Sequence, residues 1–257
     1  MNFVIIWAIA ANGFQETIRD RVLYFIIFFA LLLAIALQLL PEIAAGAEDK
    51  IFLDLGLAAI GFLTAIVAIF IGTGLVNKEI EKRTVLVLIP KPISPTEFIL
   101  GKHLGLSAVL GVMIAAMVLI YCLLLNWAEI TYPFGSILIC NIYLFFQLML
   151  IIAVAIVFGV FTSSTLATLF SFGIYLMGHF SGDLVELGRL NDNTSIKLLT
   201  ETIYIILPDL SRLDLKNEAV YNLIPAQAEL FTDALYGLCY TAVLLAIAIL
   251  VFRQRQF

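Results

Sequence analysis

The chain has 257 residues, of which 63% are hydrophobic and 13% are charged. Soluble domains hold about 45–50% apolar and about 25% charged residues, and so few charges could not cover so much apolar surface in water. The composition excludes a soluble enzyme, and the formal net charge of −5 offers no basic surface for nucleic acid.

Residues 1–21 are expected to form an amphipathic helix at the membrane interface. Its apolar members recur at helical spacing and are Phe3, Trp7, Ala10, Phe14 and Ile18. The triplet Ala8-Ile9-Ala10 resembles the cleavage site of a signal peptide. The basic residues Arg19 and Arg21 follow the apolar stretch instead of preceding it, which favours the interfacial helix over a signal peptide.

Six apolar runs follow that are long enough, or nearly so, to cross a bilayer as helices. A hydrocarbon core about 30 Å thick needs about 20 apolar residues in a helix. The runs cover residues 22–40, 52–76, 104–126, 135–161, 165–180 and 234–252. None shows the period of two that marks a strand of a membrane barrel. We therefore expect an all-α polytopic membrane protein in which residues 1–257 form a single transmembrane domain.

The distribution of Lys and Arg predicts the orientation of these spans. With six crossings, one side of the membrane receives nine Lys and Arg residues and the other side receives five. Four of the five lie in the long segment 181–233, and long loops count little in this rule. We therefore expect a protein of the cell (inner) membrane with both termini in the cytoplasm.

Residues 77–103 would form the longest cytoplasmic segment. A charged stretch and an apolar run come first, and Pro90 and Pro92 prevent one continuous helix. Ser94 and Glu97 have the spacing of a capping box, which predicts that a helix starts there and continues into the next span. The segment either anchors two span ends or forms a docking surface for a soluble partner, since its apolar run is unsuited to water.

The same segment resembles the cytoplasmic loop of type-2 ABC transporter permeases, the six-span membrane subunits of exporters. The resemblance rests on Glu79-x-Glu81-x-x-Thr84, Pro92-Ile93-Ser94 and Gly101-Lys102 with a further glycine at Gly105. It extends to the layout of the whole chain. Arg83 and Pro95 depart from the pattern, because glycine and arginine are commoner there. Residues 207–221 are similar to the branch related to copper-enzyme-maturation permeases.

The resemblance implies that this loop is a coupling helix that fits a groove on a separate ATPase subunit. Carried over by position, the coupling residues are Glu79, Glu81, Arg83, Thr84, Pro92, Gly101 and Lys102. The implied partners are two ATPase subunits, which hold ATP and magnesium, and a second permease that is either an identical copy or a paralogue. The chain itself has no G-x-x-x-x-G-K-[ST] phosphate loop. We therefore expect no catalytic residue and no cofactor in it.

Neutral polar residues inside the predicted spans are the candidates for a cargo pathway. They are Asn141, Gln147, Thr168, Ser171 and Tyr175. The last three share one helix face, where the alternative is hydrogen bonding between helices. The three cysteines lie in apolar runs, and His103 and His179 fall on opposite sides of the membrane, so no metal site is expected. His179 is expected at the membrane interface.

The segment 181–233 would be the large external loop. It either forms a cap that seals the bundle or contains a re-entrant or interfacial helix around the apolar residues 203–207. The leading functional hypothesis is the permease subunit of an ABC exporter. The alternatives are a scaffold or signalling subunit of an ABC assembly that moves no cargo, and an intramembrane enzyme. The stretch Gly178-His179-Phe180-Ser181-Gly182 does not match the G-x-S-x-G motif of a serine nucleophile.

Overall fold

The computed structural model describes residues 2–18, 22–44, 46–81, 94–189, 197, 198, 200, 202, 204, 205 and 207–254. These residues contain helices and no strand. The elements are α1 (Phe3–Thr17), α2 (Leu23–Ile43), α3 (Glu48–Glu81), α5 (Pro95–Trp127), α6 (Phe134–Phe161), α7 (Ser164–His179), α8 (Ser181–Arg189), the 3-10 turn η2 (Ser211–Leu213), α10 (Lys216–Tyr221) and α11 (Gln227–Gln254). The expected all-α class is confirmed for this part of the chain.

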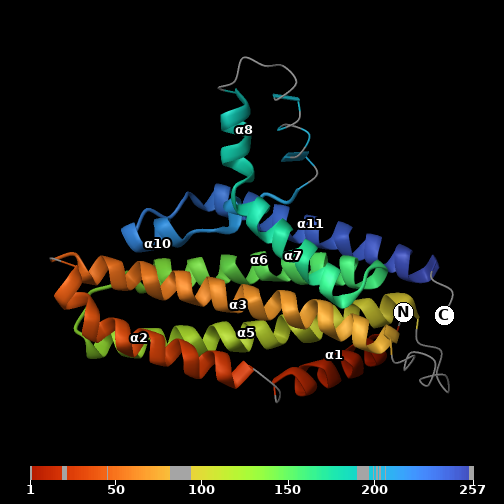
Figure 1. Cartoon of the computed structure of the whole chain (residues 1–257), viewed down its shortest axis with the longest axis horizontal. Coiled ribbons are helices and arrows are strands. Elements are labelled where there is room, and N and C mark those ends of the chain that lie inside the picture. The colour runs from red at the N-terminus through yellow and green to blue at the C-terminus, as the bar shows by residue number, and fades with distance from the viewer. Residues whose placement is uncertain are drawn as a thin grey trace.

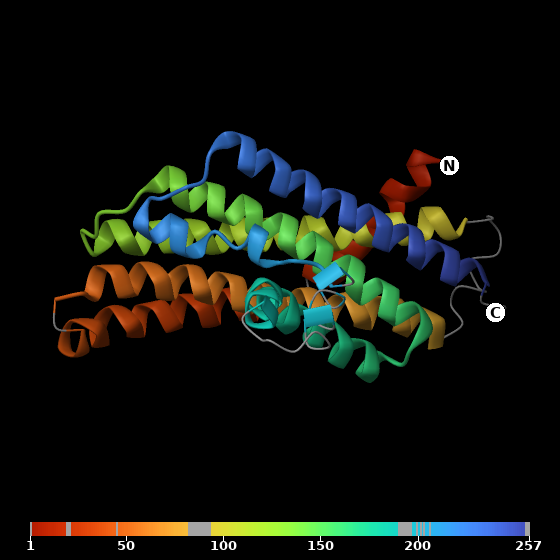
Figure 2. The same cartoon turned by 90° about the horizontal axis from the view of Figure 1, so that it is seen from above.

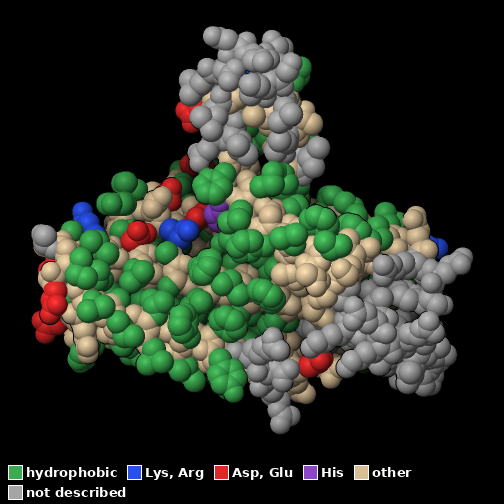
Figure 3. Space-filling model, in the orientation of Figure 1, with side chains coloured by type: hydrophobic (Ala, Val, Ile, Leu, Met, Phe, Trp, Pro, Cys, Tyr) green, Lys and Arg blue, Asp and Glu red, His purple; other side chains and the backbone are tan. Residues whose placement is uncertain are grey.

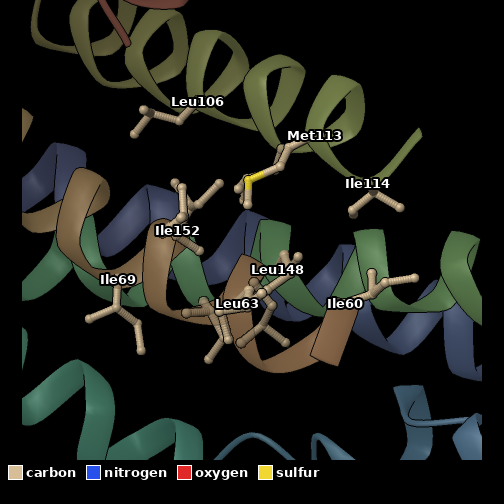
Figure 4. Packing of buried hydrophobic residues seen from close by; sticks show 14 of the residues in the cluster. Ile60, Leu63, Ile69, Leu106, Met113, Ile114, Leu148 and Ile152 are labelled. Carbon is tan, nitrogen blue, oxygen red and sulfur yellow. The ribbon is translucent and has the colours of Figure 1, made fainter. Parts of the chain in front are cut away.

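The long helices run side by side and form one elongated bundle (Figures 1 and 2). Helix α6 lies at its centre and contacts α3, α5, α7 and α11. Every residue from 150 to 156 is buried, as expected for a helix that is apolar on all sides and surrounded by protein. Side chains of α3, α5 and α6 meet in the core, among them Ile60, Met113 and Ile152 (Figure 4).

Five of the described helices are long and apolar enough to cross a membrane. They are Leu23–Ile43, Glu48–Gly74, Pro95–Trp127, Phe134–Phe161 and Gln227–Gln254. Helix α7 corresponds to the predicted run 165–180 but has 16 residues. A helix of this size is about 24 Å long, which is shorter than the thickness of a hydrocarbon core, about 30 Å. The sixth crossing and the orientation of the termini stay predictions.

Several helix ends meet at one end of the bundle, which we call the terminal end. Residue Asn2 contacts Glu97 there, and Phe98 stacks on Phe252 near the end of α11. Helix α7 also starts at this end but stops partway along the bundle, and α8 points away from it (Figure 1). The space beyond α7 is covered by the returning segment, residues 207–226, whose helix α10 contacts α3 and α6.

The close contact between α3 and α6 depends on Gly72. A β-carbon at this position would lie 2.8 Å from the Cβ of Ala155, whereas a β-carbon at Gly74 would meet nothing within 4 Å. Alanine favours a helix over glycine by about 1 kcal/mol, but overpacking costs about 1–3 kcal/mol.

We therefore expect Gly72→Ala to lower the melting temperature of the purified protein in detergent. The matched variant Gly74→Ala should leave the melting temperature unchanged or raise it. Equal melting temperatures for the two variants would contradict the close α3–α6 contact.

Candidate functional site

The predicted coupling segment, residues 77–103, continues into α5, which begins at Pro95. Ser94 Oγ accepts a hydrogen bond from the backbone N–H of Glu97 at 3.2 Å, and Glu97 Oε2 accepts one from the backbone N–H of Ser94 at 3.1 Å. Pro95 occupies the first helical position, where its missing N–H costs nothing. The capping box predicted at Ser94 is therefore confirmed.

The second carboxylate oxygen of Glu97 ties this turn to the start of α1. Oε1 accepts a hydrogen bond of 2.6 Å from the backbone N–H of Asn2. Asn2 in turn caps α1, because its Oδ1 accepts a hydrogen bond from the backbone N–H of Val4 at 3.1 Å. One carboxylate thus joins the first turns of two helices, through Asn2 and Glu97, which are 95 residues apart in sequence.

Helix α1 lies across α5 at two glycines. A β-carbon at Gly101 would lie 2.7 Å from the Cβ of Ile9, and one at Gly105 would lie 2.6 Å from the carbonyl oxygen of Ala10. The spacing Gly101-x-x-x-Gly105 places both glycines on one helix face, which allows two helix backbones to approach closely. The face of α1 turned toward the protein contains the buried residues Ile6, Ala10, Gly13 and Thr17.

The same part of α5 also meets α11. The rings of Phe98 and Phe252 stack with centroids 5.3 Å apart. Lys102 is only 3% exposed, and its Nζ lies 5.9 Å from the centroid of the Phe98 ring, within the range of a cation–π contact. The terminal end is therefore one packed unit in which α5 holds both α1 and α11.

The predicted coupling residues fall into three groups. Glu79 and Glu81 lie in the last turn of α3, where only the backbone is described. Arg83, Thr84 and Pro92 lie outside the described residues. Gly101 and Lys102 are buried in α5 and contact α1 and Phe98, as described above.

Substitution of Glu97 tests the junction between α1 and α5. Glu97→Gln keeps the shape of the side chain but replaces one acceptor oxygen by an NH₂ group, so one of the two backbone N–H groups loses its partner. Loss of a helix cap costs about 0.5–2 kcal/mol. We expect amide hydrogen exchange in α1 to accelerate by roughly two- to thirtyfold, measured by mass spectrometry.

The matched control is Glu16→Gln, which alters an exposed carboxylate on α1 itself. This control should leave the exchange of α1 unchanged. Unchanged exchange both in α1 and in the first turn of α5 of Glu97→Gln would mean that the carboxylate does not join the two helices.

The candidate pathway residues do not line one continuous channel. Asn141 and Gln147 are buried in α6, and Asn141 Nδ2 donates to the carbonyl oxygen of Ile137 at 2.8 Å. Thr168 Oγ1 lies 2.8 Å from Thr73 Oγ1 of α3. This contact agrees with the alternative of hydrogen bonding between helices. Two buried atoms of the candidate pathway residues, Asn141 Oδ1 and Ser171 Oγ, have no hydrogen-bond partner in the part of the chain that the structure describes.

A groove separates parts of α3 and α7. Its volume is about 620 Å³, and its lining residues are Phe62, Ile66, Phe70, Ser164, Thr165, Thr168, Leu169 and Phe172. The groove is mostly apolar with a few hydroxyl groups, the composition that is usual for sites that bind small organic molecules. Thr168 is the one candidate pathway residue that lines it.

Gln147 and Tyr175 meet at His179 instead. Gln147 Nε2 lies 2.8 Å from His179 Nε2, and the carbonyl oxygen of Tyr175 lies 2.8 Å from His179 Nδ1. His179 was expected only to mark the membrane interface, so the sequence interpretation missed these contacts. The local sequence carries no signal for the contact with Gln147, which is 32 residues away.

A second polar centre was also missed, at Asp209 in the returning segment. Its buried carboxylate accepts hydrogen bonds from the side chains of Ser181, Tyr204, Ser211 and Arg212. Its backbone N–H donates to the hydroxyl of Tyr236 in α11 at 2.8 Å. Burial acts to raise the pKa of Asp209, but the four side-chain hydrogen bonds outweigh it and hold the pKa below its usual range.

The lowered pKa of Asp209 predicts a loss of stability in acid. The unfolded chain binds this proton more readily than the folded chain, so the carboxylate contributes its full stability above the ordinary carboxyl pKa. The contribution is lost as the pH falls through the lower pKa of the folded state. We expect the melting temperature of Asp209→Asn to depend less on pH below about 4 than that of the wild type.

The exposed carboxylate of Glu229 provides the control for this measurement. Glu229→Gln should keep the acid dependence of the wild type. An acid dependence that is equally steep in Asp209→Asn would rule out this role for Asp209.

The buried helical core and the five apolar helices of spanning length define a multi-pass membrane protein. Residues 7–257 match the family described as ABC-2 family transporter protein. The chain therefore belongs to this family and is a permease, the membrane component of an ABC transporter. The resemblance to type-2 ABC permeases is thereby confirmed. No curated protein matches the chain.

Proposed function

We propose that the chain is the permease subunit of an ATP-driven ABC exporter and that residues 77–103 couple it to a separate ATPase subunit. The observation that carries the proposal is the packed unit at the terminal end. Helix α5, which contains the last residues of the coupling segment, is joined there to α1 through Glu97 and to α11 through Phe98. A displacement of the coupling segment would therefore move three helices together instead of one.

The proposed assembly contains two ATPase subunits and two permeases, the second permease being an identical copy or a paralogue. ATP and magnesium are held by the ATPase subunits, and this chain performs no chemistry of its own. Both termini lie in the cytoplasm, and the protein resides in the cell (inner) membrane. Within the family we assign the chain to the branch that resembles copper-enzyme-maturation permeases, on the basis of residues 207–221.

The groove between α3 and α7 is the surface that we assign to the cargo. The apolar lining and the hydroxyl groups of Ser164 and Thr165 favour an apolar or amphiphilic molecule over an inorganic ion. Helix α3 extends into the coupling segment, since residues 77–81 belong to both. A movement of that segment would therefore reach one wall of the groove without passing through another element.

Reversal of the two acidic residues at the end of α3 tests the coupling. We expect Glu79→Lys combined with Glu81→Lys to abolish the stimulation of the partner's ATPase activity by the permease. Opposite charges across an interface contribute specificity and association rate, and their reversal places like charges against the partner. Insertion of the variant into the membrane should be normal, as judged by its yield in the membrane fraction.

A matched double reversal is available at the opposite end of the bundle. Glu42 and Glu129 are both exposed there, and Glu42→Lys combined with Glu129→Lys should keep full ATPase stimulation. Full stimulation in the Glu79 and Glu81 double variant would remove these residues from the coupling site.

The proposal as a whole is tested by gentle extraction of the tagged chain from its native host. We expect an ABC ATPase to copurify, and we expect the reconstituted complex to move cargo in an ATP-dependent manner. A complex that hydrolyses ATP without any cargo movement would instead support a scaffold or signalling subunit. A chain that is always extracted alone would overturn the proposal.

A further inference from the structure

Polar side chains meet where α7 ends and the returning segment crosses α6. His179, the last residue of α7, lies between Gln147 of α6 and Asp214 of the returning segment. Its Nε2 is 2.8 Å from Gln147 Nε2 and 3.7 Å from Asp214 Oδ2. The same Asp214 oxygen accepts a hydrogen bond of 2.9 Å from Lys216 Nζ.

These groups are partly accessible to solvent. The side chains of His179, Asp214 and Lys216 are 19%, 21% and 33% exposed. Figure 3 shows histidine, acidic and basic side chains gathered in one place on a face that is otherwise largely hydrophobic. The cluster therefore lies at the surface of the bundle and not in its core.

The hydrogen bonds determine which ring nitrogen carries the proton. His179 Nδ1 faces the carbonyl oxygen of Tyr175 at 2.8 Å, and a carbonyl oxygen can only accept, so Nδ1 must donate. In the neutral ring, Nε2 then carries no hydrogen and accepts a hydrogen bond from the Gln147 amide. The tautomer follows from this network of partners.

Protonation of His179 changes the partners that Nε2 can have. A protonated Nε2 donates and can no longer accept from the Gln147 NH₂ group, so that amide must turn or the ring must move. The nearest carboxylate is that of Asp214. A charge-assisted hydrogen bond to a carboxylate is roughly twice as strong as one between neutral groups, which favours movement of the ring toward Asp214.

We propose that His179 and Asp214 form a proton-sensitive latch that fastens the returning segment to the end of α7 when His179 is protonated. Lys216 Nζ already contacts the same Asp214 oxygen, so this carboxylate would have two cationic neighbours in the latched state. The other titratable groups around the cluster are Tyr175 on α7, Cys140 on α6 and Glu218 on α10. None of the groups belongs to the predicted coupling segment, so the latch does not depend on the proposed ATPase.

The latch would act on a segment that is also held by apolar contacts and by the hydrogen bonds of Asp209 to Ser181 and Tyr236. Leu210, Leu213 and Leu215 of the returning segment are buried against the bundle, and the backbone N–H of Leu210 donates to the carbonyl oxygen of Gly178. Protonation of His179 would add one ionic contact between α7 and the returning segment, and loss of the proton would remove it. Acid would therefore reduce the mobility of the returning segment without a change in the fold.

A spin label on Asn217, which is exposed on α10, measures this mobility in the full chain. The three cysteines are replaced by alanine, and the labelled protein is reconstituted in lipid nanodiscs. Spectra are compared at about pH 5.5 and about pH 7.5. We expect the mobile fraction of the label to fall at the lower pH.

Two variants assign the response to the latch. His179→Gln keeps a polar side chain but cannot be charged, and Asp214→Asn removes the carboxylate while leaving the histidine in place. We expect loss of the pH response in both variants. Glu186→Gln, which alters an exposed carboxylate on α8, should keep the response of the wild type.

Two results would overturn the latch. One is a mobile fraction that is the same at both pH values in the wild type. The other is a full pH response in either His179→Gln or Asp214→Asn. Because the two variants change different residues, failure of one of them to fold leaves the other as a test. An ATPase that never copurifies would overturn the proposed function but would leave this measurement unaffected.

Discussion

The close crossing of α1 over α5 is the contact on which the terminal end of the bundle depends. Gly101 and Gly105 leave room for the backbone of α1, and the Glu97 carboxylate holds the first residues of both helices. Any side chain larger than hydrogen at either glycine would separate the two helices. With α1 in this position, the helix ends at the terminal end of the bundle pack against one another instead of ending independently.

Much of the helical architecture could be predicted from the sequence, because its signals are local. Each apolar run predicted to span corresponds to one helix, and the capping box at Ser94 marks the start of α5 within one residue. The docking of α1 was not predicted, although the Gly101-x-x-x-Gly105 spacing is visible in the sequence. The apolar stripe of α1 suggested burial in lipid as a whole. Phe3 and Trp7 of this stripe are exposed, whereas Ala10 of the same stripe is buried.

The polar residues of the bundle were harder to interpret, since a helix can satisfy them without any partner element. Thr64, Ser107 and Thr241 each donate to the carbonyl oxygen four residues earlier, which removes most of the cost of a hydroxyl group in a membrane. A polar side chain in a span is therefore weak evidence for a pathway. Contacts between distant segments are what distinguish such residues from one another. The contact of His179 with Gln147, and those of Asp209 with Ser181 and Tyr236, could not be derived from local sequence.

The early end of α7 explains why the returning segment is part of the bundle and not merely a loop. Beyond His179 the chain leaves the bundle as α8, so the next stretch of α6 would lack a neighbour on that side. Residues 207–226 fill this place, and Gly178 permits the approach, because a β-carbon there would lie 2.7 Å from Leu210 Cγ. Helix α7 and the returning segment thus act together as one composite element along α6. Its two parts are joined by the backbone hydrogen bond between Leu210 and Gly178, and the His179 ring lies beside the Asp214 carboxylate. A composite of this kind can open at its junction, which a continuous helix cannot do without breaking its own backbone hydrogen bonds.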